Sequence, residues 1–198
     1  LWDSGKIKSN QSVQVVYNGK PLTTRMFCFW KVKIWDSEKK ITSWSNKAKW
    51  SMGLLNPEDW KAKWISIERG NKNLDSHASP MLRKEIALSK QVKLAQISLC
   101  GLGYYEMFLN GSKVGDHVLD PTWTSYHKNA LYVTYDITNS LKSGKNAIGV
   151  QLANGVYNQE FKDAWNFQNA PWRAFPQMLL QLDVTYVDGT KDCFASDE

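Results

Sequence analysis

The chain has 198 residues, 42% of them hydrophobic and 22% charged, which is enough for one large folded domain or two small ones. No apolar stretch reaches the roughly 18 residues of a membrane-spanning helix, so we expect no membrane segment. The formal net charge is +6, but the lysines are spread among apolar residues without a nucleic-acid-binding motif, so nucleic acid is not expected as a partner.

The first 56 residues contain three segments in which apolar and polar residues alternate, the pattern of half-buried strands. Their apolar positions are Val13, Val15 and Tyr17, then Cys28, Trp30, Val32 and Ile34, then Ala48, Trp50 and Met52. Asn18-Gly19 and residues 36–40 have turn composition. We therefore predict a first β domain over residues 1–56.

Residues 53–80 differ in character and predict a junction followed by a loop. Pro57 and the two acidic residues after it are typical of a single helical turn. Residues 68–80 are polar and irregular, which favours a loop. We place the second domain at residues 57–198.

Alternation resumes after this junction and predicts a series of short strands. The alternating residues are Ala95, Ile97 and Leu99; Tyr105, Met107 and Leu109; Leu131, Val133, Tyr135 and Ile137; Ile148, Val150 and Leu152; and Met178 to Tyr186, before a strand at residues 191–196. Asn110-Gly111 predicts a type I′ hairpin turn. Gly101 and Gly103 precede a strand, which argues against a phosphate-binding loop. Many short strands with turns are typical of a β-sandwich or jelly roll.

Few residues predict chemistry. Cys28, Cys100 and Cys193 lie far apart and form no Cys-x-x-Cys pair, so neither zinc nor a disulfide framework is expected. His77, His117 and His127 have no metal-ligand spacing, and we interpret His127 as a surface residue. There is no G-x-S-x-G sequence, and the acidic residues fall mostly in turns.

Residues 154–175 are the strongest candidate for a binding site, because long loops rich in aromatic and polar residues are often functional. The candidate residues are Asn154, Tyr157, Asn158, Trp165, Asn166, Trp172 and Arg173 in this loop, with Trp123 and Tyr126 from a second loop. Aromatic rings and amides suit the apolar and hydroxyl faces of a sugar. The same rings suit packing of the loop onto the sandwich or another domain, and Trp123 and Tyr126 fit the edge of the core equally well.

Three ordered blocks carry a family resemblance: "GLGYYEMFLNGSKVGDHVLDPTWTSYHKNALYVTYDIT" (101–138), "GKNAIGVQLANGVYN" (144–158) and "WNFQNAPWRAFPQMLLQLDVTYVDGT" (165–190). They resemble the N-terminal jelly-roll domain of bacterial α-L-rhamnosidases. Residues 1–56 resemble the fibronectin-III-like domain that precedes it, but are too few for all of that domain. We therefore expect a fragment of a longer chain, also because Leu1 is not an initiator residue and because we expect the chain to stop inside the last strands of the jelly roll.

The resemblance implies an all-β fold: a partial fibronectin-III or immunoglobulin-like sandwich followed by a galactose-binding-like jelly roll. In this family the catalytic unit is an (α/α)-barrel later in the chain, and nothing in this sequence resembles it. We therefore expect no catalytic residue here, and a non-catalytic part of an inverting enzyme that releases terminal α-L-rhamnose. The alternative is a free-standing lectin-like sandwich.

The resemblance also implies partners. In some rhamnosidases the corresponding domain binds L-rhamnose with calcium, so Trp165 or Trp172 is a hypothetical platform for a rhamnosyl unit. Asn154, Asn158, Asn166 and Arg173 would then bind its hydroxyls. The absence of a D-x-D-x-D-G sequence predicts no dedicated calcium site, although calcium on loops stays open. The missing barrel would be the second partner, and a periplasmic or secreted location is favoured.

Overall fold

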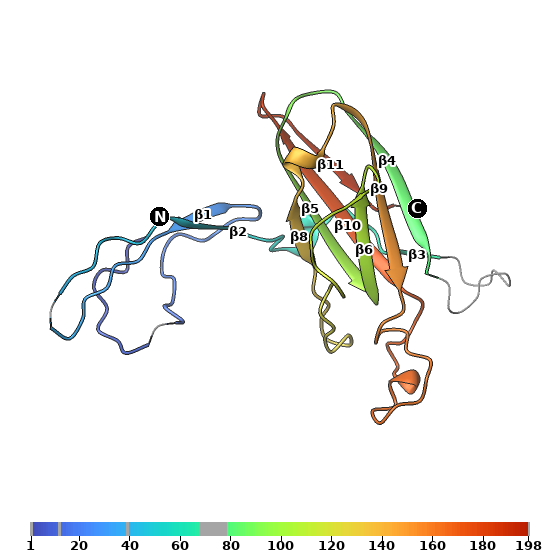
Figure 1. The fold of residues 1–198 in the computed structure, drawn as a ribbon, viewed down its shortest axis with the longest axis horizontal. Helices are drawn as coiled ribbons and strands as arrows, with labels where there is room; N and C mark the ends of the chain where they lie inside the picture. The colour runs from blue at the N-terminus through green and yellow to red at the C-terminus, as the bar shows by residue number, and fades with distance from the viewer. Residues whose placement is uncertain (1, 12, 39, 68–78, 198) are drawn as a thin grey trace. The chain divides into compact units, whose positions relative to one another are not determined.

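The computed structural model describes residues 2–11, 13–38, 40–67 and 79–197 (Figure 1). The chain divides into two compact units, Leu1–Trp60 and Lys61–Glu198. We describe each unit by itself. Most of the predicted loop at residues 68–80, with His77, lies outside the described residues.

In its described residues the first unit has one antiparallel strand pair, β1 (Phe27–Trp30) and β2 (Ala48–Ser51). The predicted helical turn is confirmed as a 3-10 helix, η1 (Pro57–Asp59). The Asp59 carboxylate accepts hydrogen bonds from the hydroxyl of Thr24 and from the backbone N–H groups of Leu55 and Asn56. These bonds, that from Thr24 first, lower the pKa of Asp59 and attach η1 to the first unit.

The predicted strand at Val13–Tyr17 is wrong, because residues 13–17 form no strand. The alternation also predicted that Trp30, Val32 and Ile34 share one buried face with Cys28. Their side chains are exposed, whereas Cys28 is 2% exposed. Beyond β1, residues 32–36 meet residues 40–45 through separate hydrogen bonds and one isolated bridge, Trp35–Ile41, without forming a continuous strand. A two-stranded sheet covers little surface, so alternation along the sequence does not produce burial here.

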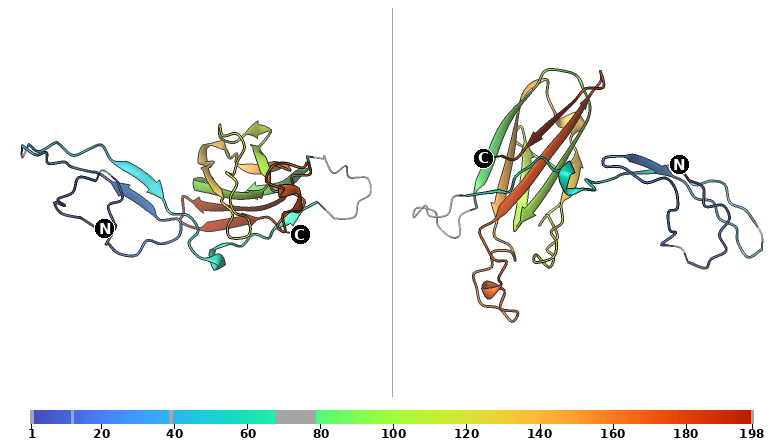
Figure 2. Two further views of the ribbon diagram at one scale, coloured as in Figure 1. Left: turned by 90° about the horizontal axis from the view of Figure 1, so that it is seen from below. Right: turned by 180° about the vertical axis from the view of Figure 1, so that it is seen from behind.

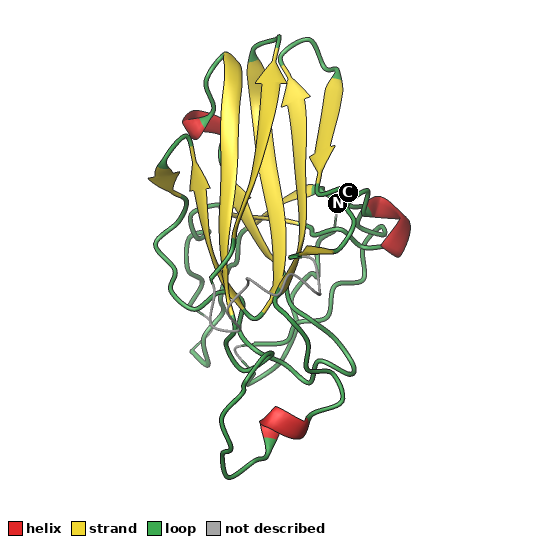
Figure 3. Ribbon diagram, turned by 90° about the vertical axis from the view of Figure 1, so that its right-hand side faces the viewer, coloured by secondary structure: helices red, strands yellow, loops and turns green. Residues whose placement is uncertain are grey.

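The second unit is a sandwich of two antiparallel sheets, seen as two layers in Figure 2 and with its strands side by side in Figure 3. One sheet has the order β11-β10-β5-β8, with β3 also paired to β10, and the other has the order β4-β9-β6-β7. The strands are β3 (Ile65–Ser66), β4 (Met81–Leu88), β5 (Val92–Leu102), β6 (Tyr104–Leu109), β7 (Ser112–Lys113), β8 (Val133–Asp136), β9 (Gly144–Ala153), β10 (Gln177–Tyr186) and β11 (Lys191–Ala195). Two 3-10 helices, η2 (Thr138–Ser140) and η3 (Phe167–Asn169), lie in its loops.

The core of this unit lies between the two sheets and consists mostly of the residues whose alternation predicted strands, together with Ile86 and Leu88 of β4. It includes Ala95, Ile97, Leu99, Tyr105, Met107, Leu109, Ile148, Val150, Leu152, Met178, Leu180, Leu182, Val184 and Tyr186. The all-β sandwich is therefore confirmed. Strand β4 was not predicted, because Lys84 interrupts its apolar face; its ammonium donates to Ala195 O and Asp197 Oδ1 at the sheet edge.

Two glycine positions fix how the strands connect. Gly103 is the single residue between β5 and β6, where the chain passes from one sheet to the other; its φ is +102°, and a Cβ there would lie 2.2 Å from Ala153 O. The predicted hairpin is confirmed at Asn110-Gly111, whose φ angles are 53° and 87°. Both glycines therefore serve strand connections, as the sequence predicted, and not a phosphate loop.

Candidate functional site

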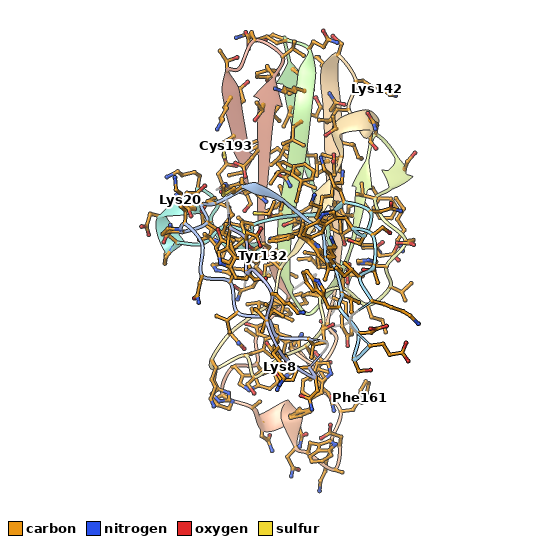
Figure 4. The ribbon with its side chains drawn as sticks, turned by 90° about the vertical axis from the view of Figure 1, so that its left-hand side faces the viewer. Lys8, Lys20, Tyr132, Lys142, Phe161 and Cys193 are labelled. Carbon is orange, nitrogen blue, oxygen red and sulfur yellow. The ribbon has the colours of Figure 1, made fainter. Side chains whose placement is uncertain are left out.

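The candidate loops lie at one end of the second unit. The β9–β10 loop (residues 154–176) extends beyond the sheets, and the β7–β8 segment (residues 114–132) extends toward the same end (Figure 1). Figure 4 places Phe161 at this end and Lys142 at the opposite end of the unit. Two loops that are far apart in sequence therefore lie at the same end of the unit. This is the arrangement that the grouping of Trp123 and Tyr126 with the long loop predicted.

Five rings from these loops form an aromatic cluster, defined as Trp123, Tyr126, Tyr157, Phe167 and Trp172. Trp172 is its centre: its ring centroid lies 5.1 Å from that of Tyr126, 6.1 Å from that of Tyr157 and 6.0 Å from that of Phe167. Tyr126 meets Tyr157 edge-on at 5.1 Å, and Trp123 meets Phe167 edge-on at 6.0 Å. Edge and offset contacts at these distances are the favourable arrangements of aromatic rings.

The cluster packs its own loops together. Tyr157 is buried and Trp172 half-buried. Burial raises the pKa of Tyr126 to about 12, with smaller effects from Tyr104, Cys100 and Tyr157. Three rings contact Trp172, and one of them, Tyr157, is stacked on its face, so that face is not open to a ligand.

Trp165, the other predicted platform, lies outside the cluster. Its side chain is 77% exposed and makes no ring contact with another aromatic residue in the described part of the chain. The loop that carries it is organised by Asp163, whose carboxylate accepts from the backbone N–H groups of Trp165 and Phe167 and from Gln159 Nε2. Asn166 is exposed with a φ of 55°, in the left-handed region. Trp165 is thus an exposed ring on a defined turn.

The predicted polar residues divide between the interior and the surface of the loop. Asn158 is buried, and its Nδ2 donates to Asn154 Oδ1 at 2.9 Å. Arg173 Nη2 lies 3.6 Å from Glu160 Oε1, and its Nε is buried without a hydrogen-bond partner among the described residues. The structure therefore places the Asn158 amide inside the loop, where it bonds to the chain itself.

A second group, which the sequence reasoning missed, surrounds Asp120 at the open edge of the sandwich. The Asp120 carboxylate accepts from the Tyr135 hydroxyl at 2.5 Å and lies 2.9 Å from His117 Nδ1. The Tyr135 hydroxyl is 3.2 Å from the Tyr105 hydroxyl. The only signal in the sequence was a His and an Asp three residues apart on an irregular segment, a spacing with no periodic meaning.

Among the described residues, no group of three or more His, Cys, Asp or Glu side chains is arranged to hold a metal ion. The described helices are also too short to cross a membrane.

Comparison with family models gives two matches. Residues 90–198 match the model of the alpha-L-rhamnosidase N-terminal domain, and residues 1–56 match that of the Rha78A-like N-terminal immunoglobulin domain. The first match covers more than half of the chain. It contains the aromatic cluster and the His117–Asp120 pair.

Individual relatives agree with these matches. An alpha-L-rhamnosidase of Formosa agariphila is 40% identical over 100% of this chain and 23% of its own length. A structure of alpha-L-rhamnosidase from Dictyoglumus thermophilum is 37% identical with a TM-score of 0.82, covering 100% of this chain and 22% of that one. A structure of Streptomyces avermitilis alpha-L-rhamnosidase complexed with L-rhamnose has a TM-score of 0.83 at 22% identity. The match covers 99% of this chain and 35% of that one. The chain therefore spans about a quarter of the length of the curated relative.

Proposed function

Because the chain belongs to the alpha-L-rhamnosidase N-terminal domain family, we propose that it is the non-catalytic N-terminal part of an enzyme that releases terminal α-L-rhamnose from glycosides. Its match to about the first quarter of a rhamnosidase supports this over the alternative of a free-standing lectin. Its partners would be the catalytic (α/α)-barrel and, through the barrel, a rhamnose-containing glycoside. A periplasmic or secreted location remains our proposal.

Within that enzyme, we propose that the β9–β10 loop is a docking surface for the catalytic barrel. The observation that carries this is the division of the loop into a packed base and exposed rings. Trp172 is half-buried and contacts three other rings, whereas Trp165 and Phe161 are 77% and 75% exposed.

Burial of such rings favours association. Covering one large apolar side chain contributes roughly 1.5–3 kcal/mol. Aromatic side chains are also enriched at protein interfaces. The aromatic cluster holds the base of the loop in one conformation, so little ordering entropy opposes docking.

Hydrogen exchange tests this role. We expect the backbone amides of residues 160–170 to exchange more slowly in the complete enzyme than in the 198-residue chain. Changing Trp165 and Phe161 together to Ala in the complete enzyme should restore fast exchange. Equal exchange in the two proteins would contradict docking through this loop.

Sugar binding by the same loop is a second candidate, favoured by the exposed Trp165 ring beside the exposed Asn166 amide. Titration of the chain with L-rhamnose, with and without calcium, separates the two functions. Saturable changes in the Trp165 indole signal would support sugar binding, and a calcium requirement would support an ion on the loops. An unchanged signal leaves docking as the role of the loop.

A further inference from the structure

A cleft of about 390 Å³ lies at the open edge of the sandwich, between residues 112–117 and 133–140. It shares no lining residue with the aromatic cluster. We propose that this cleft binds one neutral sugar unit, with His117 Nε2 accepting a hydrogen bond from a sugar hydroxyl. The choice of a sugar rests on the proposed function of the enzyme, whereas the cleft and its hydrogen bonds do not.

The lining of the cleft is amphipathic. Its apolar part is Leu109, Val114, Val133 and Ile137, and its polar part includes Ser112, His117, Thr134, Tyr135 and Ser140. The volume falls in the range of small-molecule sites, roughly 300–1,000 Å³. An apolar wall beside hydroxyl and imidazole groups matches a sugar ring, which has C–H faces and a rim of hydroxyls.

The hydrogen bonds around Asp120 determine which nitrogen of His117 is available. The Asp120 side chain is 17% exposed and that of His117 is 56% exposed. A carboxylate only accepts, so the facing Nδ1 of the imidazole carries the proton. Whenever this imidazole is neutral, its lone pair is therefore on Nε2, where it accepts from a hydroxyl.

Tyr135 keeps this arrangement in place. Burial first, and then the bond to Asp120, raise the pKa of Tyr135 to about 12, so the hydroxyl stays protonated and donates to the carboxylate. The Tyr135 ring packs on the backbone of Gly115, where an added Cβ would lie 2.8 Å from Tyr135 Cε1. The ring centroid of His117 lies 6.0 Å from that of Tyr135.

The charges around the cleft favour a neutral ligand. Lys113 Nζ is already paired with Glu106 Oε1 at 2.6 Å. Asp136 Oδ1 accepts from the backbone N–H and the hydroxyl of Thr138. Each charged lining group therefore already has a partner within the chain, an opposite charge for Lys113 and two hydrogen-bond donors for Asp136, so a neutral ligand need not displace either of them.

Titration of the chain with methyl α-L-rhamnoside, followed by NMR, tests the proposal. The sequence has only three histidines, so the imidazole signals are readily assigned. We expect saturable shifts at His117 and at the amides of residues 112–117 and 133–140. His117→Ala should weaken binding at least about tenfold, a difference of about 1.4 kcal/mol, whereas the exposed control His127→Ala should leave it unchanged.

Nitrogen-15 chemical shifts of the imidazole test the role of Asp120 as a positioning residue. We expect the wild-type His117 to carry its proton on Nδ1, and Asp120→Asn to produce a mixture of tautomers with weaker sugar binding. If Asp120→Asn does not fold, Tyr135→Phe removes only the hydroxyl that holds the Asp120 carboxylate. Sugar binding should weaken while the proton stays on Nδ1, because the carboxylate still accepts from it.

Three results would overturn the inference: a proton on Nε2 in the wild type, no shift at His117 up to about 100 mM sugar, well beyond millimolar affinity, or full binding by His117→Ala. Shifts confined to Trp165 would also overturn it, because they place the sugar on the β9–β10 loop. None of these results alters hydrogen exchange in the complete enzyme, so the inference and the docking proposal fail separately.

Discussion

The ring of Trp172 stacks on that of Tyr157, with centroids 6.1 Å apart and an interplanar angle of 20°. The two residues stand near opposite ends of the β9–β10 loop, so the stack closes the loop at its base. Long loops lose much entropy on ordering, and a contact of this kind offsets that cost where the loop leaves the sheets.

Trp172→Ala should therefore destabilise the second unit. It removes contacts with Tyr126, Tyr157 and Phe167, and we expect a loss of roughly 2–4 kcal/mol, near the lower end for a large aromatic core residue because Trp172 is only half-buried. Urea unfolding measures the difference. The matched control Trp165→Ala removes an exposed ring and should change stability by less than about 0.5 kcal/mol. Equal losses in the two variants would show that the cluster does not hold the loop.

Gly103→Ala should be far more harmful than Gly111→Ala. Both residues have positive φ, so each substitution carries the strain of the left-handed region, about 1 kcal/mol. At Gly103 the new Cβ also meets Ala153 O at 2.2 Å, whereas nothing lies within 4 Å at Gly111. We expect Gly103→Ala to lower the thermal midpoint much further, or to prevent folding. Similar midpoints would contradict the close approach of β6 and β9.

Asn146→Ala should cost roughly 2–4 kcal/mol. The side chain is 2% exposed; its Oδ1 accepts from Lys142 N and Asn110 Nδ2, and its Nδ2 donates to Lys142 O. The substitution leaves these buried groups without partners, at about 1–3 kcal/mol for each one that water does not reach. Asn139→Ala, at an exposed position, is the control. Chemical unfolding of both variants compares them, and a loss below 1 kcal/mol at Asn146 would mean that water replaces the amide.

Stability at low pH should depend on Asp188. Hydrogen bonds from the Thr190 hydroxyl and then from Lys90 lower the pKa of Asp188 from 3.8 to about 2. Because the folded-state pKa is the lower one, the ionised carboxylate stabilises the fold above pH 4, and this contribution is lost as the pH falls from about 4 to about 2. Asp188→Asn should thus be less stable than the wild type at pH 6 but not at pH 2. A pH-independent difference in urea unfolding would disprove the linkage.

The sandwich of the second unit was predictable because its strands have one buried face. In β9 and β10 nearly every second side chain enters the core, so alternation in the sequence reports burial directly. Strand β4 was not predicted because Lys84 is one of its inward-facing residues and interrupts the apolar pattern. The charged end of Lys84 reaches the sheet edge. The strand predicted at residues 13–17 failed for the opposite reason: alternation is present but no layer covers it.

The candidate site was predictable only in part. The composition of the long loop predicted that its aromatic residues belong to the site. The fold also places the ring of Tyr126, from the second loop, in contact with that of Trp172. Sequence could not tell which ring is enclosed and which is exposed, because Trp165 and Trp172 lie in the same kind of polar surroundings. The contact between His117 and Asp120 depends on the path of an irregular segment and on Tyr135 from another strand, and no local pattern encodes it.

Because Gly103 alone connects β5 to β6, the second unit does not tolerate an inserted residue at this corner. A residue inserted there would shift β6 against β9 by one position and turn every inward side chain of β6 to the outside. The β9–β10 loop has no such constraint beyond its closed base, because additional residues at its tip leave both strands in register. Extra residues at the loop end of the sandwich therefore spare the strand register, although next to Phe161 and Trp165 they would alter the proposed docking surface, while the corner between the sheets keeps its length.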